Sequence, residues 1–199
     1  PSVPSVPINS NEVQTKGGEK FTDLQNVEWA IKSINALVKA GIVKGTSETT
    51  FEPNRGITRA EFCKLISTAF GLEESDETTV FTDILADDWF YSSVMAAAKA
   101  GVVTGYPDGG FLPNAEISRE ETAVMLIRAF KAAGVAVPDG KMTFADADDM
   151  GEWSVNEIAS LVQMGIVNGK GDNKFAPKDN LTRAEAAKMI YGATIAMQN

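Results

Sequence analysis

The sequence predicts an all-α fold built from three tandem helix–loop–helix repeats. The chain repeats itself from Phe21 onward, and from Trp29 onward a set of marker residues returns three times in fixed register. Each copy also contains two segments with apolar residues at helical spacing. Units of about 60 residues with two amphipathic helices do not bury both faces alone. The three copies must therefore pack together, as an open solenoid or as a closed pseudo-threefold, and the lack of atypical polar caps at the chain ends favours closure.

The bulk composition excludes several classes of function. The chain has 199 residues, of which 44% are apolar, and a net charge of −9. This acidity disfavours nucleic acid and anionic membranes as partners. No apolar run reaches the roughly 18 residues that span a bilayer, so we expect no membrane insertion. Because the chain has no histidine, His-based triads and His-ligated zinc are excluded, and with Cys63 as its single cysteine it has no internal disulfide.

The composition of residues 1–20 predicts a linker. This segment has three prolines in its first seven residues and is mostly polar after them. A linker at this position, with no initiator Met and no signal peptide, fits a mature or excised segment with a cargo domain upstream. The repeats are expected at 21–75, 76–140 and 141–199, and together they should form one domain over 21–199.

The register of the three copies is strict. No insertion or deletion separates the tryptophan of any copy from the start of its second helix. A Phe-x-Asp triplet precedes each tryptophan, and its acids Asp23, Asp83 and Asp146 are expected to cap a turn or a helix. The other markers are Trp29, Gly41, Gly45, Phe51, Pro53 and Arg59 in the first copy, Trp89, Gly101, Gly105, Phe111, Pro113 and Arg119 in the second, and Trp153, Gly165, Gly169, Phe175, Pro177 and Arg183 in the third.

The first helix of the first copy is expected to run from about Trp29 to Ala40. Gly41 stands where a left-handed residue ends a helix. Two apolar residues between two glycines then form a tight connector, and a polar turn leads to the Phe-x-Pro sequence. The proline is expected to keep the residue before it extended. The apolar face of this helix comprises Ile31, Ile34, Leu37 and Val38.

The second helix of each copy is expected to start at a capping box. The boxes are Thr58-Arg59-Ala60-Glu61, Ser118-Arg119-Glu120-Glu121 and Thr182-Arg183-Ala184-Glu185. The hydroxyl accepts a hydrogen bond from the third helical N–H, and the Glu reaches back to the cap N–H, so both residue types are explained without a ligand. The arginine is not, because a cation in the first turn faces the positive end of the helix dipole.

These residues together resemble the S-layer homology (SLH) family. The resemblance lies in the Phe-Thr-Asp triplet, the tryptophan, the glycine-bracketed connector, the Phe-x-Pro turn and the Thr-Arg-Ala-Glu box, and it covers residues 21–195. It implies one pseudo-trimer with a central three-helix bundle and grooves between adjacent repeats. It also implies a non-covalent cell-wall anchor, extracellular, at the cell wall or S-layer surface of a bacterium. The implied partner is a secondary cell-wall polysaccharide, often bound through pyruvylated N-acetylmannosamine.

That implied ligand suits the unexplained arginines. A pyruvyl ketal bears a carboxylate, and an N-terminal helical turn is expected to offer it free N–H groups and a positive dipole. Arginine adds a planar fork that matches a carboxylate with two hydrogen bonds. The first candidate ligand-binding residues are therefore Arg59, Arg119 and Arg183.

Two further sets of candidates keep their alternatives open. The first is the family tryptophan, at Trp29, Trp89 and Trp153. An indole face is a platform for a sugar, and it is equally a core anchor at a helix start. The second is one polar slot of the connector, at Lys44, Thr104 and Asn168. These residues either line a groove or lie on an ordinary surface, and their differences imply unequal grooves.

Other functions find less support in the sequence. A glycosidase needs two carboxylates about 5–10 Å apart across a cleft, but Glu61, Glu121 and Glu185 are committed to caps. We therefore expect no catalytic residue, no enzyme activity and no cofactor. The acidic clusters at 83–88 and 146–149 lack the spacing of a calcium-binding EF-hand loop, so no metal ligand is predicted. The alternative function is a calcium-dependent or self-associating surface-layer assembly module.

Overall fold

The computed structural model describes residues 20–73 and 81–198, so the predicted linker lies outside the described residues except at its last position. The described part contains six α-helices, one short 3-10 helix and no strand, and the all-α prediction is confirmed. The helices are α1 (Glu28–Lys39), α2 (Arg59–Phe70), α3 (Tyr91–Lys99), α4 (Arg119–Ala132), α5 (Val155–Gln163) and α6 (Arg183–Ala196), with the 3-10 turn η2 (Ala147–Asp149) before α5.

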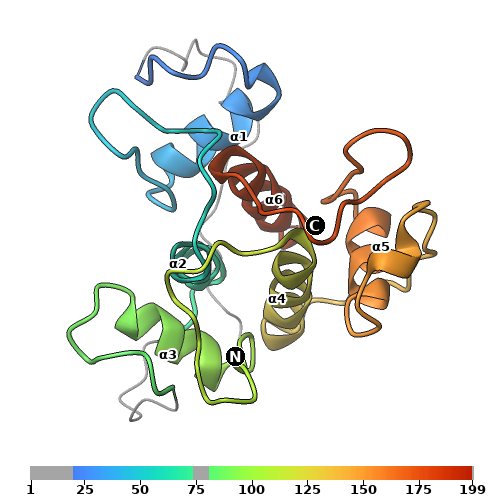
Figure 1. The fold of residues 1–199 in the computed structure, drawn as a ribbon. Coiled ribbons are helices and arrows are strands. Elements are labelled where there is room, and N and C mark those ends of the chain that lie inside the picture. Colours follow the sequence, from blue (N-terminus) through green and yellow to red (C-terminus); the bar gives the residue numbers. More distant parts are fainter. Residues whose placement is uncertain (1–19, 74–80, 199) are drawn as a thin grey trace.

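The six helices form an inner and an outer layer. The second helices of the copies, α2, α4 and α6, lie at the centre, and the first helices, α1, α3 and α5, lie around them (Figure 1). In the inner layer, α2 packs on both α4 and α6. In the outer layer, α3 packs on α2, α5 packs on α4, and α1 packs on α6. Each outer helix thus packs on the inner helix of another copy, and the copies interlock.

A ring of backbone hydrogen bonds closes the three copies on one another. The residue just before each capping box donates its N–H to the equivalent carbonyl of another copy: Ile57 to Leu181 (2.9 Å), Ile117 to Ile57 (3.1 Å), and Leu181 to Ile117 (2.9 Å). The third copy therefore returns to the first. An open solenoid would leave the first and third copies apart, so the arrangement is the closed one.

The core follows the predicted apolar faces. The second helices bury Phe62, Ile66 and Phe70 in α2 and their counterparts in α4 and α6. The phenylalanines of the three Phe-x-Pro turns are fully buried as well. Each of them packs against the phenylalanine of its own triplet, with ring centroids 5.4–5.7 Å apart. The core is continuous through all three copies.

One turn differs from its prediction. The residue before the proline is not extended: Glu52, Leu112 and Ala176 each have φ 58°. The reason is the acid of the triplet, which caps this turn as expected. Asp146, for example, accepts the N–H groups of Phe175 (2.9 Å) and Ala176 (2.8 Å), and these bonds require the backbone to bend there. The other left-handed prediction is confirmed, since the glycine at position 41 has φ 72°.

Candidate ligand-binding grooves

All three capping boxes form as predicted. In the first box, Glu61 N donates to Thr58 Oγ1 at 3.2 Å, and Thr58 N donates to Glu61 Oε2 at 2.9 Å. The boxes at Ser118 and Thr182 have the same reciprocal bonds. The box arginine is therefore the first residue of each inner helix, at the end of that helix where the three copies meet.

The first N–H groups of these helices are not free, so the expectation of a ready anion site there was wrong. Arg59 N donates to Ala115 O (2.9 Å) and Ala60 N to Pro113 O (3.0 Å). The equivalent groups of α4 and α6 donate to Asp179 O, Pro177 O, Arg55 O and Pro53 O. Ring closure explains the difference, because it places the Phe-x-Pro turn of another copy over each helix start. An anion at these sites must be bound by side chains.

The arginine side chains are buried between copies and are only 5–8% exposed. Arg59 donates from Nε to Phe111 O and from Nη1 to Glu121 Oε1, both at 2.9 Å. Arg119 makes the same bonds to Phe175 O (2.9 Å) and Glu185 Oε1 (3.1 Å). The fold therefore accounts in part for the box arginine, whose presence the capping box did not explain. Each arginine joins its own helix to another copy, whatever else it binds.

Three grooves lie at these junctions, and each is lined by all three copies. A groove takes its tryptophan from one copy, its arginine from another, and its connector and capping Glu from the third; we name it by the tryptophan. The Trp29 groove contains Arg119, Asn168, Lys170, Glu185 and Lys188. The Trp89 groove contains Arg183, Lys44, Glu61, Lys64 and Thr68. The Trp153 groove contains Arg59, Thr104, Tyr106, Glu121 and Arg128.

The structure thus brings all nine candidate residues into three sites. The Trp89 and Trp153 grooves have volumes of about 320 and 310 Å³, at the lower end of the range for small-molecule sites, and the Trp29 groove is smaller, at about 190 Å³. Each volume suits a short stretch of a polymeric ligand better than a large enclosed ligand.

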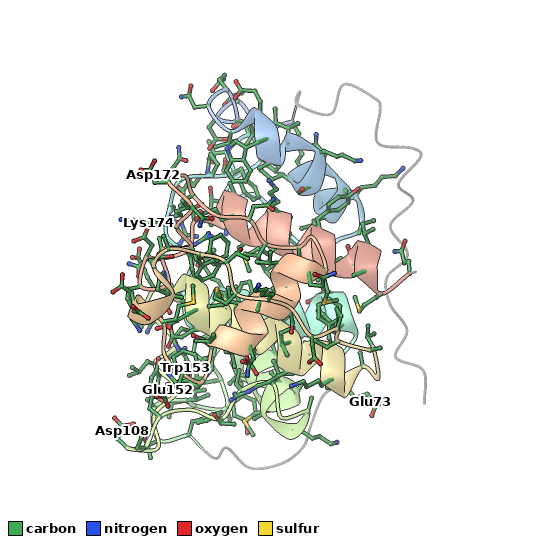
Figure 2. All side chains as sticks on the ribbon, turned by 90° about the vertical axis from the view of Figure 1, so that its right-hand side faces the viewer. Glu73, Asp108, Glu152, Trp153, Asp172 and Lys174 are labelled. Atoms are coloured by element: carbon green, nitrogen blue, oxygen red, sulfur yellow. The ribbon has the colours of Figure 1, made fainter. Side chains whose placement is uncertain are left out.

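The tryptophans are exposed at the surface and are not core anchors. Trp29, Trp89 and Trp153 are 49%, 59% and 53% exposed. Figure 2 shows Trp153 on the side of the molecule that also carries Asp108, Asp172 and Lys174, with Glu73, beyond the C-terminus of α2, on the opposite side. The tryptophans precede or begin the outer helices, which ring closure places beside the inner helix starts.

Cations lie against two of the tryptophans, and sequence reasoning missed them. Lys188 Nζ is 5.2 Å from the centroid of the Trp29 ring, and Lys64 Nζ is 5.1 Å from that of Trp89. Both lysines stand five residues after the box arginine of their copy, where the second copy has Val124. The alignment of the repeats contains these lysines at equivalent positions. It does not reveal their partners, because the tryptophan beside each lysine comes from a different copy.

The connector residues Lys44, Thr104 and Asn168 are exposed at the groove walls. Their backbone carbonyls also help to hold the arginines: Lys44 O accepts from Arg183 Nη2 at 3.0 Å and Asn168 O from Arg119 Nη2 at 3.2 Å. The side chains are thereby left at the groove surface, where their different chemistry makes the three walls unequal.

Two of the three capping carboxylates, Glu61 and Glu121, are held ionised in the grooves. Burial alone would raise the pKa of Glu61, but hydrogen bonds from Arg55 and Thr58 N and the nearby charges lower it below its ordinary value. The pKa of Glu121 is lowered in the same way, against burial, by hydrogen bonds from Tyr106 and Ser118 and by the charge of Arg59. Burial and the bond to Glu121 raise the pKa of Tyr106 to about 12. Each groove is therefore a cationic site that already contains one carboxylate.

The acidic clusters are used by the fold. Asp83 and Asp146 accept backbone N–H groups of the Phe-x-Pro turns, and Asp88 Oδ2 accepts the N–H of Leu85 at 2.8 Å. Over residues 20–73 and 81–198, no three His, Cys, Asp or Glu side chains are grouped so that they could hold a metal ion.

Comparisons with known proteins agree with this architecture. The family model of the S-layer homology domain matches residues 20–63, 80–123 and 143–187. The chain is 38% identical over 175 residues to an amylopullulanase of Thermoanaerobacterium thermosulfurigenes and 36% identical over 175 residues to the exoglucanase XynX of Acetivibrio thermocellus. It is 34% identical over 174 residues to the S-layer protein sap of Bacillus anthracis.

These matches include 86–87% of this chain but only 9%, 16% and 21% of the three relatives, respectively. The similarity is thus confined to a segment that proteins of different names share. With three family matches in tandem, and with the capping boxes and grooves formed at the matching positions, the chain belongs to the S-layer homology family.

Proposed function

We propose that the chain is a non-covalent cell-wall anchoring module that binds a secondary cell-wall polysaccharide through pyruvylated N-acetylmannosamine. One observation carries the proposal: each groove brings together an exposed tryptophan, a box arginine and a polar connector residue from three different copies. The three kinds of residue fit the parts of such a ligand. An indole face packs against the apolar face of a sugar ring, a guanidinium matches the ketal carboxylate, and the connector offers polar contacts.

The location fits this function. The family match and the S-layer relatives indicate the cell wall or cell surface. None of the helices described in the structure is both long and apolar enough to cross a membrane. Binding to a wall polymer supplies an attachment that needs no spanning helix.

The relatives also fit an anchor that is joined to different cargo. Two of them are named as enzymes and one as an S-layer protein, yet each shares this segment as a minor part of its length. An attachment module is a function that all three could share. We extend this to the present chain, with a cargo domain in the full-length protein, and assign the chain itself no catalytic activity.

Three grooves on one domain would strengthen attachment to a polymer. Once one groove is occupied, a second meets the same polymer at a high effective concentration, provided that the polymer can reach both. Individually weak sites would then give a stable attachment. The net charge of −9 opposes any anionic polymer at long range, so the cations in the grooves must act at close range.

The test is a calorimetric titration of the domain with pyruvylated wall polymer and with the same polymer after removal of its ketals. We expect heat of binding from the first and none, or a much weaker response, from the second. A variant with Trp29, Trp89 and Trp153 all changed to Ala keeps every buried residue and should bind neither. Equal binding of the ketal-free polymer would refute the carboxylate part of the proposal, and release of shortened saccharides would indicate an enzyme instead.

A further inference from the structure

The first copy contains a cation that the other two copies lack. Arg55 stands four residues before the box arginine, where the second copy has Ala115 and the third has Asp179. Its side chain is 37% exposed and lies beside the Trp89 groove, next to the capping residue Glu61. Of the three junctions between copies, this one alone has a second guanidinium at the capping carboxylate in the described residues.

Arg55 holds Glu61 with two hydrogen bonds. Its Nη2 donates to Glu61 Oε1 at 2.6 Å and its Nη1 donates to Glu61 Oε2 at 3.2 Å. A fork of this kind is the strongest way for a side chain to hold a carboxylate. The carboxylate of Glu61 is thereby directed toward Arg55 and is largely neutralised by it.

Arg183 is therefore paired only loosely with this carboxylate. Its Nη1 is 3.8 Å from Glu61 Oε1, beyond hydrogen-bond distance, and makes no hydrogen bond within the described residues. Its other contacts are to the carbonyls of Phe51 and Lys44. Burial and then repulsion by Arg55 lower the pKa of Arg183, against the charges of Glu61, Glu52 and Asp23. Two guanidinium groups therefore lie near the single carboxylate of Glu61, and Arg55 is the one hydrogen-bonded to it.

The box arginine of the Trp29 groove is more fully engaged. Arg119 bonds directly to Glu185 Oε1 at 3.1 Å, and its Nε and Nη2 donate to backbone carbonyls. The neighbouring cation, Lys170, is paired with Asp179 at 3.0 Å. Of the three cations that line this groove, Arg119 and Lys170 are thus paired with carboxylates, and Lys188 lies against Trp29.

The Trp153 groove differs in another way. Arg59 bonds to Glu121 at 2.9 Å, and its guanidinium lies over the rings of Tyr106 and Phe111, 4.7 and 5.1 Å from their centroids. Tyr106 in turn bonds to Glu121 at 2.5 Å. The ring of Tyr106 thus covers a face of the arginine, and this groove has Val124 where the other two have a lysine against the tryptophan.

We propose that the Trp89 groove is the primary site for a carboxylate-bearing sugar, and that Arg55 is the positioning residue that makes it so by holding Glu61 away from Arg183. The groove adds Lys44 at its wall and Lys64 against Trp89, so an anion there meets three cations besides Arg55. This inference rests on the proposed function. It goes further by ranking the three grooves by their affinity for this sugar and by naming Arg55 as the cause of the difference.

The chain offers a separate reporter for each groove, because its only three tryptophans lie one in each. Three double Trp→Phe variants therefore leave one fluorescent groove at a time. Each is titrated with a pyruvylated N-acetylmannosamine glycoside while the tryptophan emission is followed. We expect the variant that keeps Trp89 to respond with a Kd at least about tenfold below those of the other two, as one additional charge-assisted contact would give.

The role of Arg55 is tested in the variant that keeps Trp89. Arg55→Gln should raise its Kd about tenfold for the pyruvylated glycoside, with no change for the ketal-free glycoside. Arg55→Lys should restore part of the affinity, since a single ammonium neutralises Glu61 less specifically than a fork. Lys131→Gln removes the same charge from an exposed position in the last turn of α4, and the Kd should stay unchanged.

A final variant shows whether Arg55 acts through Glu61. Glu61→Gln keeps a side chain that can close the capping box, and in this background Arg55→Gln should lose most of its effect. If the three reporters share one Kd, or if Arg55→Gln leaves the Kd of the Trp89 groove unchanged, the ranking is wrong while the proposed function stands. If no reporter responds to the pyruvylated glycoside, the proposed function itself fails.

Discussion

Arg183 Nε donates a hydrogen bond of 2.9 Å to the carbonyl oxygen of Phe51, although 132 residues separate the two in the sequence. The bond joins the start of the last helix to the turn of the first copy. Its counterparts join Arg59 to Phe111 and Arg119 to Phe175. The box arginine, which we propose as a ligand contact, therefore also helps to close the ring of three copies. The two roles have to be separated by experiment.

The stability role of the arginines is tested at Arg119. Arg119→Ala should lower the free energy of unfolding by about 3 kcal/mol, because it removes a buried cation and takes one hydrogen bond from Glu185 and from each of two backbone carbonyls. Urea denaturation followed by circular dichroism measures the change. Lys131→Ala, at an exposed position of the same helix, should change it by less than about 0.5 kcal/mol. A loss below about 1 kcal/mol at Arg119 would mean that ring closure does not depend on this side chain.

In contrast to the buried arginines, the exposed tryptophans should affect ligand binding and have little effect on stability. Trp89→Ala is expected to change the free energy of unfolding by less than about 1 kcal/mol, because the ring is 59% exposed, while weakening binding of pyruvylated polymer. Phe111→Ala is the matched comparison, since Phe111 is fully buried and its truncation should cost about 3–5 kcal/mol. The pair is compared by thermal unfolding. A large loss of stability from Trp89→Ala would indicate that this tryptophan is a core anchor after all.

Stability should decrease in acid through the capping carboxylates. Because the folded protein lowers the pKa of Glu61 and Glu121 below their ordinary 4.5, their contribution is present above that pH and is lost as the pH falls through the lower, folded pKa. Unfolding measured from pH 6 down to about pH 3 should show this decline. Glu61→Gln and Glu121→Gln keep the cap but cannot titrate, so the double variant should have a flatter profile. An unchanged slope would show that other groups control acid unfolding.

The strained turn gives a substitution that should stabilise the protein or leave it unchanged. Ala176 has φ 58°, where a residue with a side chain is strained by about 1–2 kcal/mol and glycine is not. Ala176→Gly should raise the free energy of unfolding by up to about 1 kcal/mol, after the greater flexibility of unfolded glycine is subtracted. The same Ala→Gly change at Ala98 in α3 should lower it by about 1 kcal/mol. Equal losses at both positions would contradict the strain argument.

The local structure could be predicted from the sequence because its causes are local. The capping boxes at Thr58, Ser118 and Thr182, the helix end at Gly41 and the apolar faces depend on residues within a few positions of one another. The repeat register also limited the choice of fold. Where a local rule met a contact from a distant residue, it failed, as at Glu52, whose N–H is held by Asp23 from 29 positions away.

The candidate residues were found by sequence, but their assembly was not. The repeat pattern picked out the box arginine, the tryptophan and the connector slot because each returns three times. It could not show that Trp89, Arg183 and Lys44 share a groove, since they belong to three different copies. For the same reason it missed Lys64, whose partner Trp89 comes from another copy, and Arg55, which has no counterpart in the other copies.

The sequence by itself determined the helices, their caps, the apolar faces and the family, because these follow from residue type and spacing along one stretch of chain. Only the tertiary structure decided that the copies interlock in a ring, that the helix N–H groups are already bonded, and that Arg183 beside Trp89 makes no hydrogen bond to a carboxylate within the described residues. The physical reason is that hydrogen bonds and charges act over a few ångströms in space. Which groups lie within that distance was settled when the third copy packed against the first.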